Sequence, residues 1–243
     1  MERLTGSPRI VDVYSHCGGS VWVEAMPHEM EEIIVPGEGM AKQKDLPKEL
    51  TPLNHYTVEE KLDISLLMAE SLADLHGFSD GVVVHDDVQL AQWLRTNDGR
   101  LKLGDFNRAE VMQYDEKKGE YCTYYNGSGA GNYRAPEEFD KGYLNEKIDV
   151  FSFGNNIYSL LTGLWVFYEI DDYTSVQKEL IKGELAYVDP RWKERTFIET
   201  KLVELMEKCW VYDPMERIDI FETVKQLREI KEEHERRKAN NIE

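Results

Sequence analysis

The chain has 243 residues, which is enough for one domain or two small ones with a sizeable buried core. Its composition is that of a globular protein, with 41% apolar and 31% charged residues, and its formal net charge is -18. Such an acidic balance argues against partners that require a basic surface, namely nucleic acid and anionic membranes.

The cysteines and the apolar stretches indicate the compartment. Cys17, Cys122 and Cys209 are odd in number and lack metal-ligand spacing, which is typical of a reducing environment. The chain opens without a charged and then apolar leader, so the sequence predicts a cytoplasmic, intracellular protein. The longest apolar stretch, 148–170, contains Asp149 and two asparagines, so we interpret it as a buried core helix rather than a membrane span.

Two strands are predicted near the start of the chain, over 10–14 and 21–24, with Gly18 and Gly19 at the turn between them.

A longer helix is predicted after a loop-like stretch over 37–54. Thr57 and Glu60 have the spacing of a capping box, in which each side chain binds the other residue's backbone N–H at the start of a helix. Apolar residues then recur on one face as far as Gly77, where the helix is expected to end.

The stretch 82–106 is the most informative part of the chain. An Asp-Gly turn between alternating apolar residues predicts a hairpin made of strands 92–95 and 100–103. Asp87 precedes this hairpin and Asp105 ends it, so the ribbon brings two carboxylates to the same end. Beyond the hairpin, the amphipathic periodicity predicts helices over 201–210 and 220–229.

The chain resembles the protein kinase family in several segments that follow the family's order. His-Asp-Asp with a later glutamine aligns with the catalytic loop, and Asp-Phe-Asn aligns with the D-F-G segment. Ala-Pro-Glu matches the end of the activation segment, and two later stretches match the start of the central helix and the last signature. The matching segments are 85–92, 105–107, 135–137, 149–154 and 209–217.

The resemblance implies ATP and Mg²⁺ as cofactors and a protein hydroxyl as the substrate. Asp87 aligns with the base that receives the proton of the substrate hydroxyl. Asp105 aligns with the carboxylate that holds magnesium, and Gln92 stands where the family has its second metal ligand.

The resemblance also implies an adenine site at a hinge that is followed by a short helix over 28–35. Glu24 and Met26 align with the hinge, whose backbone groups hold adenine in the family. Val23 aligns with the residue that guards the back pocket, and Leu94 aligns with the floor of the adenine site. An ordinary edge hairpin explains 10–24 equally well at this stage.

Five further positions align with structural roles in the family. His85 and Phe106 correspond to packing residues that tie the catalytic loop to the large lobe. Asp149 corresponds to the acid that holds the backbone of this loop. Glu137 and Arg217 correspond to a buried ion pair, of a kind whose disruption typically costs about 3–5 kcal/mol.

Several departures from the family pattern argue for weak catalysis. Asp86 replaces the arginine that would pair a phosphate on the activation segment, and it sets two acids side by side, where they are expected to repel. Gln92 replaces asparagine, Gln89 replaces a lysine near the transferred phosphate, and Asn107 replaces glycine. The nine residues before Ile10 span at most one strand, so the family's glycine-rich hairpin and strand lysine are missing.

We therefore expect an α+β, mainly α, protein kinase-like fold with a nearly complete helical lobe. Residues 1–27 are predicted to be a remnant of the small lobe with about two strands, and residues 28–243 the large lobe. One hypothesis is an ATP-dependent protein kinase whose phosphoryl transfer is weak or absent in this chain alone. The other is a pseudokinase, a non-catalytic scaffold that binds a protein partner. The sequence leaves the oligomeric state open.

Overall fold

The computed structural model describes residue 4 and residues 6–37, 50–127, 129–140, 142–170 and 172–241. The loop predicted over 37–54 therefore lies largely outside the described residues.

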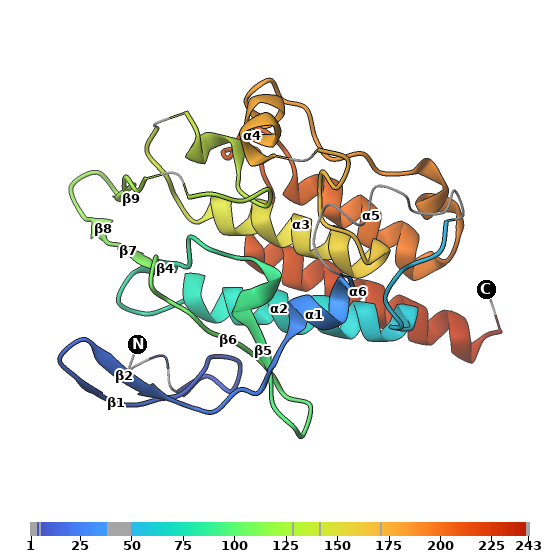
Figure 1. The fold of residues 1–243 in the computed structure, drawn as a ribbon, viewed down its shortest axis with the longest axis horizontal. Coiled ribbons are helices and arrows are strands. Elements are labelled where there is room, and N and C mark those ends of the chain that lie inside the picture. The colour runs from blue at the N-terminus through green and yellow to red at the C-terminus, as the bar shows by residue number, and fades with distance from the viewer. Residues whose placement is uncertain are drawn as a thin grey trace.

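Helices dominate the regular structure and the strands are short, which confirms the mainly helical expectation (Figure 1). None of the helices in the described ranges is long and apolar enough to cross a membrane. The β elements are β1 Val13–Cys17, β2 Ser20–Val23, β3 His28–Glu29, β4 Val82–Val84, β5 Trp93–Arg95, β6 Leu101–Leu103, β7 Glu110–Met112, β8 Tyr114–Asp115 and β9 Glu120–Tyr121. The α-helices are α1 Met30–Ile34, α2 Val58–His76, α3 Lys147–Thr162, α4 Tyr173–Ile181, α5 Phe197–Cys209 and α6 Ile220–Ala239, and the 3₁₀ helices are η3 Leu90–Gln92, η4 Pro136–Glu138 and η5 Pro190–Glu194.

Four helices form the body of the molecule, with α2 packed against α6 and α3 packed against α5 (Figure 1). Helix α3 is buried along its length, since every residue from 148 to 162 is buried, as its apolar sequence predicted. It ends earlier than expected, at Gly163, which has φ 77°. A Cβ atom at Gly163 would lie 2.7 Å from Leu53 Cβ, so both the backbone and the space favour glycine.

Helix α2 begins and ends where the sequence predicted. Thr57 Oγ1 accepts a hydrogen bond from Glu60 N at 3.2 Å, and Glu60 Oε2 accepts one from Thr57 N at 2.8 Å. The two bonds form the expected capping box. The helix ends at His76, immediately before Gly77.

The predicted hairpin after the catalytic loop is also present. Strands β5 and β6 pair antiparallel, with Trp93 opposite Leu103 and Arg95 opposite Leu101. Gly99 in the connecting turn has φ 88°, a conformation that glycine adopts without strain. Strand β3 adds to the other edge of β5, and β4 pairs separately with β7.

The first hairpin begins later than predicted, because β1 covers Val13–Cys17 rather than 10–14. Ile10 and Val11 instead lie beside Leu103 of β6, where Val11 N donates to Leu103 O at 3.0 Å. Leu103 N in turn donates to Arg9 O at 2.8 Å, and Ile10 is fully buried. The first two residues of the predicted strand therefore pair with β6 and not with β2.

The short helix predicted over 28–35 is shorter in the structure, where α1 covers Met30–Ile34. Its expected first turn is strand β3, because His28 pairs with Arg95 and Glu29 pairs with Leu94. The predicted division of the chain after residue 27 stays a prediction.

Candidate active site

The loop between β4 and β5 is anchored by a carboxylate at the start of α3. Asp149 Oδ2 accepts a hydrogen bond from His85 N at 2.7 Å, and Asp149 Oδ1 accepts one from Asp86 N at 2.9 Å. His76 Nε2 lies 3.0 Å from Asp149 Oδ2. These contacts confirm the role expected for Asp149 and show that His76, at the end of α2, supports it.

The loop is also tied to the segment that follows β6. His85 Nε2 is 2.8 Å from Gly104 O, and the His85 ring centroid is 5.0 Å from that of Phe106. Gly104 N donates to Gln92 O at 2.9 Å. The hairpin therefore brings the residues beside Asp105 to the catalytic loop, and His85 and Phe106 pack together as expected.

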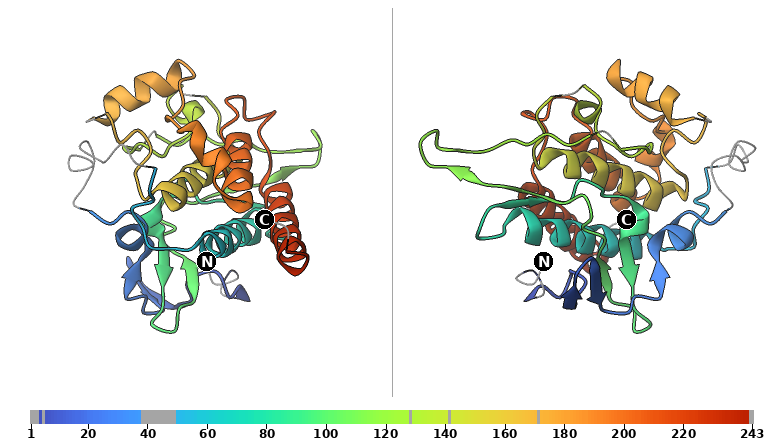
Figure 2. Two further views of the ribbon diagram at one scale, coloured as in Figure 1. Left: turned by 90° about the vertical axis from the view of Figure 1, so that its right-hand side faces the viewer. Right: turned by 60° about the vertical axis from the view of Figure 1, so that its left-hand side comes forward.

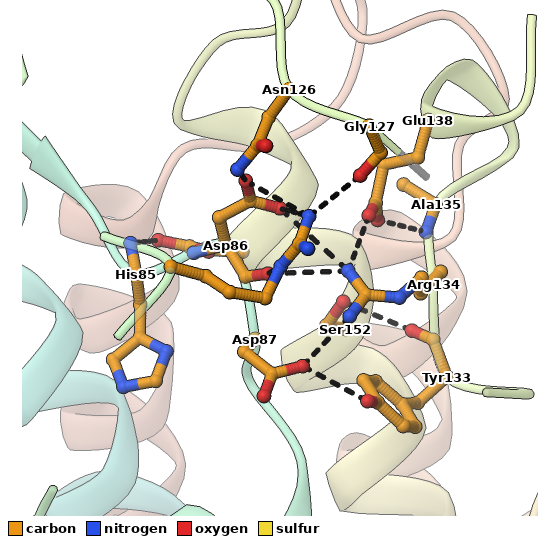
Figure 3. Close-up of polar contacts among 12 residues, drawn as sticks. His85, Asp86, Asp87, Asn126, Gly127, Tyr133, Arg134, Ala135, Glu138 and Ser152 are labelled. Atoms are coloured by element: carbon orange, nitrogen blue, oxygen red, sulfur yellow. Dashed lines mark hydrogen bonds and ion pairs between the residues drawn. The ribbon is translucent and has the colours of Figure 1, made fainter. Parts of the chain in front are cut away.

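The carboxylate of Asp87 is surrounded by donors from this chain, two of which, Tyr133 and Arg134, are drawn in Figure 3. Its Oδ1 accepts from Tyr133 Oη at 2.9 Å and from Arg134 Nη2 at 2.8 Å. Its Oδ2 accepts from Gln92 Nε2 at 2.9 Å and from Gln89 Nε2 at 3.2 Å. The four donors fill the four lone-pair sites of an ionised carboxylate, and Asp87 is only 8% exposed.

Arg134 carries a second buried partner besides Asp87. Its Nη1 donates to Glu138 Oε2 at 2.7 Å, while Ala135 N donates to Glu138 Oε1 at 2.8 Å. Burial raises the pKa of Glu138, and the charge of Arg134 partly offsets that increase. Burial likewise raises the pKa of Tyr133, so its phenol stays neutral and donates to Asp87.

Asp86 does not simply repel its neighbour, as the sequence suggested, because donors of the activation segment surround it. Asn126 Nδ2 donates to Asp86 Oδ2 at 2.5 Å, and Arg108 Nη2 lies 3.4 Å from both carboxylate oxygens. Burial raises the pKa of Asp86, while Asn126 and Arg108 act in the opposite direction. The residue has φ 59°, a left-handed conformation that is uncommon outside glycine.

The two candidate metal ligands differ in their surroundings. Asp105 is exposed and has φ 52°, whereas Gln92 is buried and uses its amide nitrogen to bind Asp87. Oxygen donors suit Mg²⁺, which is often bound through one or two protein ligands together with phosphate oxygens and water. The carboxylate of Asp105 and the carbonyl oxygen of Gln92 fit that chemistry. Among the described residues, no group of three or more acidic, histidine or cysteine side chains forms a metal cluster.

Three of the positions expected around adenine, Val23, Glu24 and Met26, lie at the end of the first hairpin and just after it. Val23 is 49% exposed and Met26 is half-buried. Glu24 Oε2 accepts from Lys102 Nζ at 2.5 Å, so its side chain fastens the hinge to β6. Leu94, on the neighbouring strand β5, packs closely enough that a Cβ atom at Gly104 would meet Leu94 Cδ1 at 2.9 Å.

The expected ion pair between the activation segment and the last helices is present. Arg217 Nη1 lies 2.6 Å from Glu137 Oε1, and Arg217 Nη2 donates to Glu137 Oε2 at 3.0 Å. The side chain of Arg217 is fully buried, which confirms the prediction. Arg217 also donates to three backbone carbonyl groups, those of Val211, Tyr212 and Lys147.

Sequence reasoning missed four residues of this site, namely Arg108, Asn126, Tyr133 and Arg134. Their contacts with the catalytic loop join positions 22 to 48 residues apart, which no local pattern reveals. One signal was available, since a buried acid at position 86 requires a cation or several donors nearby.

Comparison with known proteins agrees with this geometry. The family model of the protein kinase domain matches residues 2–227. The dual specificity protein kinase shkE of Dictyostelium discoideum is 27% identical over 206 residues, which is 80% of this chain and 27% of that protein. Mitogen-activated protein kinase kinase kinase 7 of Drosophila melanogaster is 30% identical over 163 residues, or 67% of this chain and 22% of that protein.

The chain belongs to the protein kinase family, and its helical lobe with small sheets is a protein kinase-like fold. Serine/threonine-protein kinase VIK of Arabidopsis thaliana is another relative, 27% identical over 190 residues, which cover 77% of this chain. The match covers 42% of that protein, so the chain spans less than half the length of these three relatives. Protein kinases in general use ATP and Mg²⁺ to phosphorylate proteins.

Proposed function

We propose that this domain is a protein kinase-like module whose phosphoryl transfer to protein hydroxyls is weak or absent in this chain alone. The observation that carries the proposal is the state of Asp87. A base must come within hydrogen-bond reach of the substrate hydroxyl, yet both oxygens of Asp87 are already bound by donors of this chain.

The charges around the loop support the same proposal. Phosphoryl transfer depends on cations that neutralise the developing charge. Here Arg134 is paired with Asp87 and Glu138, and Lys102 is paired with Asp12 and Glu24. These two cations are therefore already paired with the protein's own acids before a phosphate arrives.

A direct test measures magnesium-dependent transfer of labelled phosphate from ATP to a mixture of serine, threonine and tyrosine peptides. The wild-type chain should show little transfer above the level of Asp87→Asn. Robust transfer that Asp87→Asn abolishes would contradict the proposal and favour the competent kinase. The exposed residue Asp98, in the β5–β6 turn, provides a control as Asp98→Asn.

Nucleotide binding is a separate part of the proposal, with Asp105 and Gln92 as the magnesium ligands and Val23, Glu24, Met26 and Leu94 around adenine. The exposed carboxylate of Asp105 supports this assignment. A thermal-shift titration with ATP and Mg²⁺ should raise the melting temperature of the wild type, and Asp105→Asn should remove the shift. No shift in the wild type would instead favour a scaffold that does not bind nucleotide.

The second candidate is a pseudokinase that binds a protein partner without catalysis. The exposed apolar side chains of the first hairpin favour it, since Tyr14 is 69% exposed and Trp22 is 68% exposed. A partner that still binds Asp87→Asn but not Trp22→Ser would distinguish this role from substrate recognition by an active kinase.

We also propose a reducing, cytoplasmic location for the protein. The three cysteines, which are free, support it.

A further inference from the structure

The activation segment is bound to the catalytic loop through one acidic residue. Asp86 has a side chain with no exposed surface, and its carboxylate binds Asn126 and Arg108 directly. Arg134 Nη1 lies 3.7 Å from Asp86 Oδ1. A single carboxylate thus meets three side chains from separate parts of the segment between 105 and 137.

The backbone of Asp86 strengthens these contacts. Its carbonyl oxygen accepts from Arg108 Nε at 3.1 Å and from Arg134 Nη1 at 3.2 Å. Arg108 Nη2 also donates to Gly127 O at 2.8 Å. Arg108 therefore bridges the catalytic loop to the middle of the activation segment.

The charges are arranged in the reverse of the usual sense. A loop arginine would need a negative group, such as a phosphate, on the activation segment. Here the negative group is the loop residue Asp86 itself, and the positive groups, Arg108 and Arg134, belong to the segment. Because both halves of the contact are part of the unmodified chain, no added charge is required.

We propose that Asp86 is a built-in latch that holds the activation segment against the catalytic loop without phosphorylation. The latch consists of Asp86, Arg108, Asn126 and Arg134. It fixes the segment at Arg108, Asn126 and Arg134, while the β8–β9 arm between Arg108 and Asn126 stands away from the helical body (Figure 2). This latch orders the segment whether or not the domain transfers phosphate.

Amide hydrogen exchange at a backbone bridge next to the latch in the sequence provides the test. Tyr124 and Leu144 form an isolated bridge, with Tyr124 N bonded to Leu144 O at 3.1 Å and Leu144 N bonded to Tyr124 O at 2.8 Å. In protein whose intact mass shows no phosphate, both amides should be protected. Asp86→Asn should raise their exchange rates by about tenfold or more, because charge-assisted hydrogen bonds are lost.

The substitution Asp86→Asn isolates the charge, because asparagine tolerates the left-handed backbone of this position. Arg108→Gln provides a second variant, at a side chain that is 26% exposed and so less demanding for folding. If the two residues form one latch, the double variant should exchange little faster than the more affected single variant. Asp98→Asn, in the distant hairpin turn, should leave both rates unchanged.

Three outcomes would overturn the latch. The first is exchange at Tyr124 and Leu144 that is fast in phosphate-free wild type and slow only after phosphorylation. The second is an Asp86→Asn variant that exchanges at the wild-type rate. The third is an increase that is equal in the core amides of α5, because this would report global destabilisation rather than release of the segment.

Discussion

The helical lobe and the first hairpin differ in how their side chains are covered. In α3, every residue from 148 to 162 is buried, whereas in β1–β2 all residues of 14–17 and 20–23 are exposed. A two-stranded hairpin with both faces in water is marginal by itself. Figure 1 shows this hairpin below the helices.

The hairpin is therefore held at its base rather than through a packed face. Ile10 and Val11 pair with Leu103, and Lys102 binds both Asp12 and Glu24. All of these contacts join the ends of the hairpin to β6. The stability of each region depends on its buried contacts, so the two regions should respond very differently to substitution.

The largest effect is expected where a buried charge loses its partner in the helical lobe. Glu137→Gln leaves the fully buried guanidinium of Arg217 without its carboxylate, at a cost of about 3–5 kcal/mol in the free energy of unfolding. Urea unfolding followed by circular dichroism measures this loss.

The matched control is Glu207→Gln, which removes a carboxylate from Lys193 at the surface of the same lobe. Surface ion pairs contribute about 0–1 kcal/mol each, so this variant should lose much less stability. Equal losses in the two variants would contradict the larger cost expected for the buried ion pair.

The next effect is a change of about 2 kcal/mol with pH in the free energy of unfolding, and it is expected from a buried lysine. Lys61 is 1% exposed, its Nζ donates to Leu161 O at 2.9 Å, and burial lowers its pKa to about 8. Between pH 8 and the ordinary lysine value near 10.4, the unfolded chain binds more protons than the folded one. Stability from this group therefore rises with pH across that window and is lost as pH falls towards 8.

Replacing Lys61 with methionine removes this dependence. Comparing urea unfolding at pH 8 and pH 10, the wild type should gain about 2 kcal/mol relative to Lys61→Met. Lys225→Met, at an exposed lysine of α6, is the control and should not reduce that gain. If the free energy of unfolding changed with pH in the same way in the wild type and in Lys61→Met, the lowered pKa of Lys61 would be contradicted.

Sequence-based prediction succeeded where contacts join residues close in the sequence or where the family resemblance assigned them. The capping box of Thr57 and Glu60 depends on residues three apart, so a local pattern reveals it. Asp149 and Arg217 were assigned through the family resemblance, and their contacts confirm it.

What the sequence did not reveal depends on distant neighbours. Asp86 looked like a source of repulsion because Arg108 and Arg134, 22 and 48 positions away, could not be placed beside it. The start of β1 was placed three residues too early, because pairing of Ile10 and Val11 with β6 is a tertiary contact. Exposure of the hairpin was equally hidden, since alternating apolar residues predict a covered face.

A smaller effect, of about 1 kcal/mol, is expected from the helix cap. Thr57→Ala removes the oxygen that accepts from Glu60 N at the start of α2. The midpoint of urea unfolding should fall while its slope stays unchanged. Thr51→Ala, at an exposed position just before this helix, should leave the midpoint in place.

The smallest effect is expected in the hairpin. Trp22 is 68% exposed, so Trp22→Ala should change the free energy of unfolding by no more than about 0.5 kcal/mol. Trp93 of β5 is fully buried, and Trp93→Ala, the same change in the other region, should cost about 3–5 kcal/mol. If Trp22→Ala instead cost more than about 1 kcal/mol, the hairpin would be covered in solution. Repeating the measurement over a tenfold range of protein concentration would then separate a second copy of the chain, whose contribution grows with concentration, from a contact within one chain.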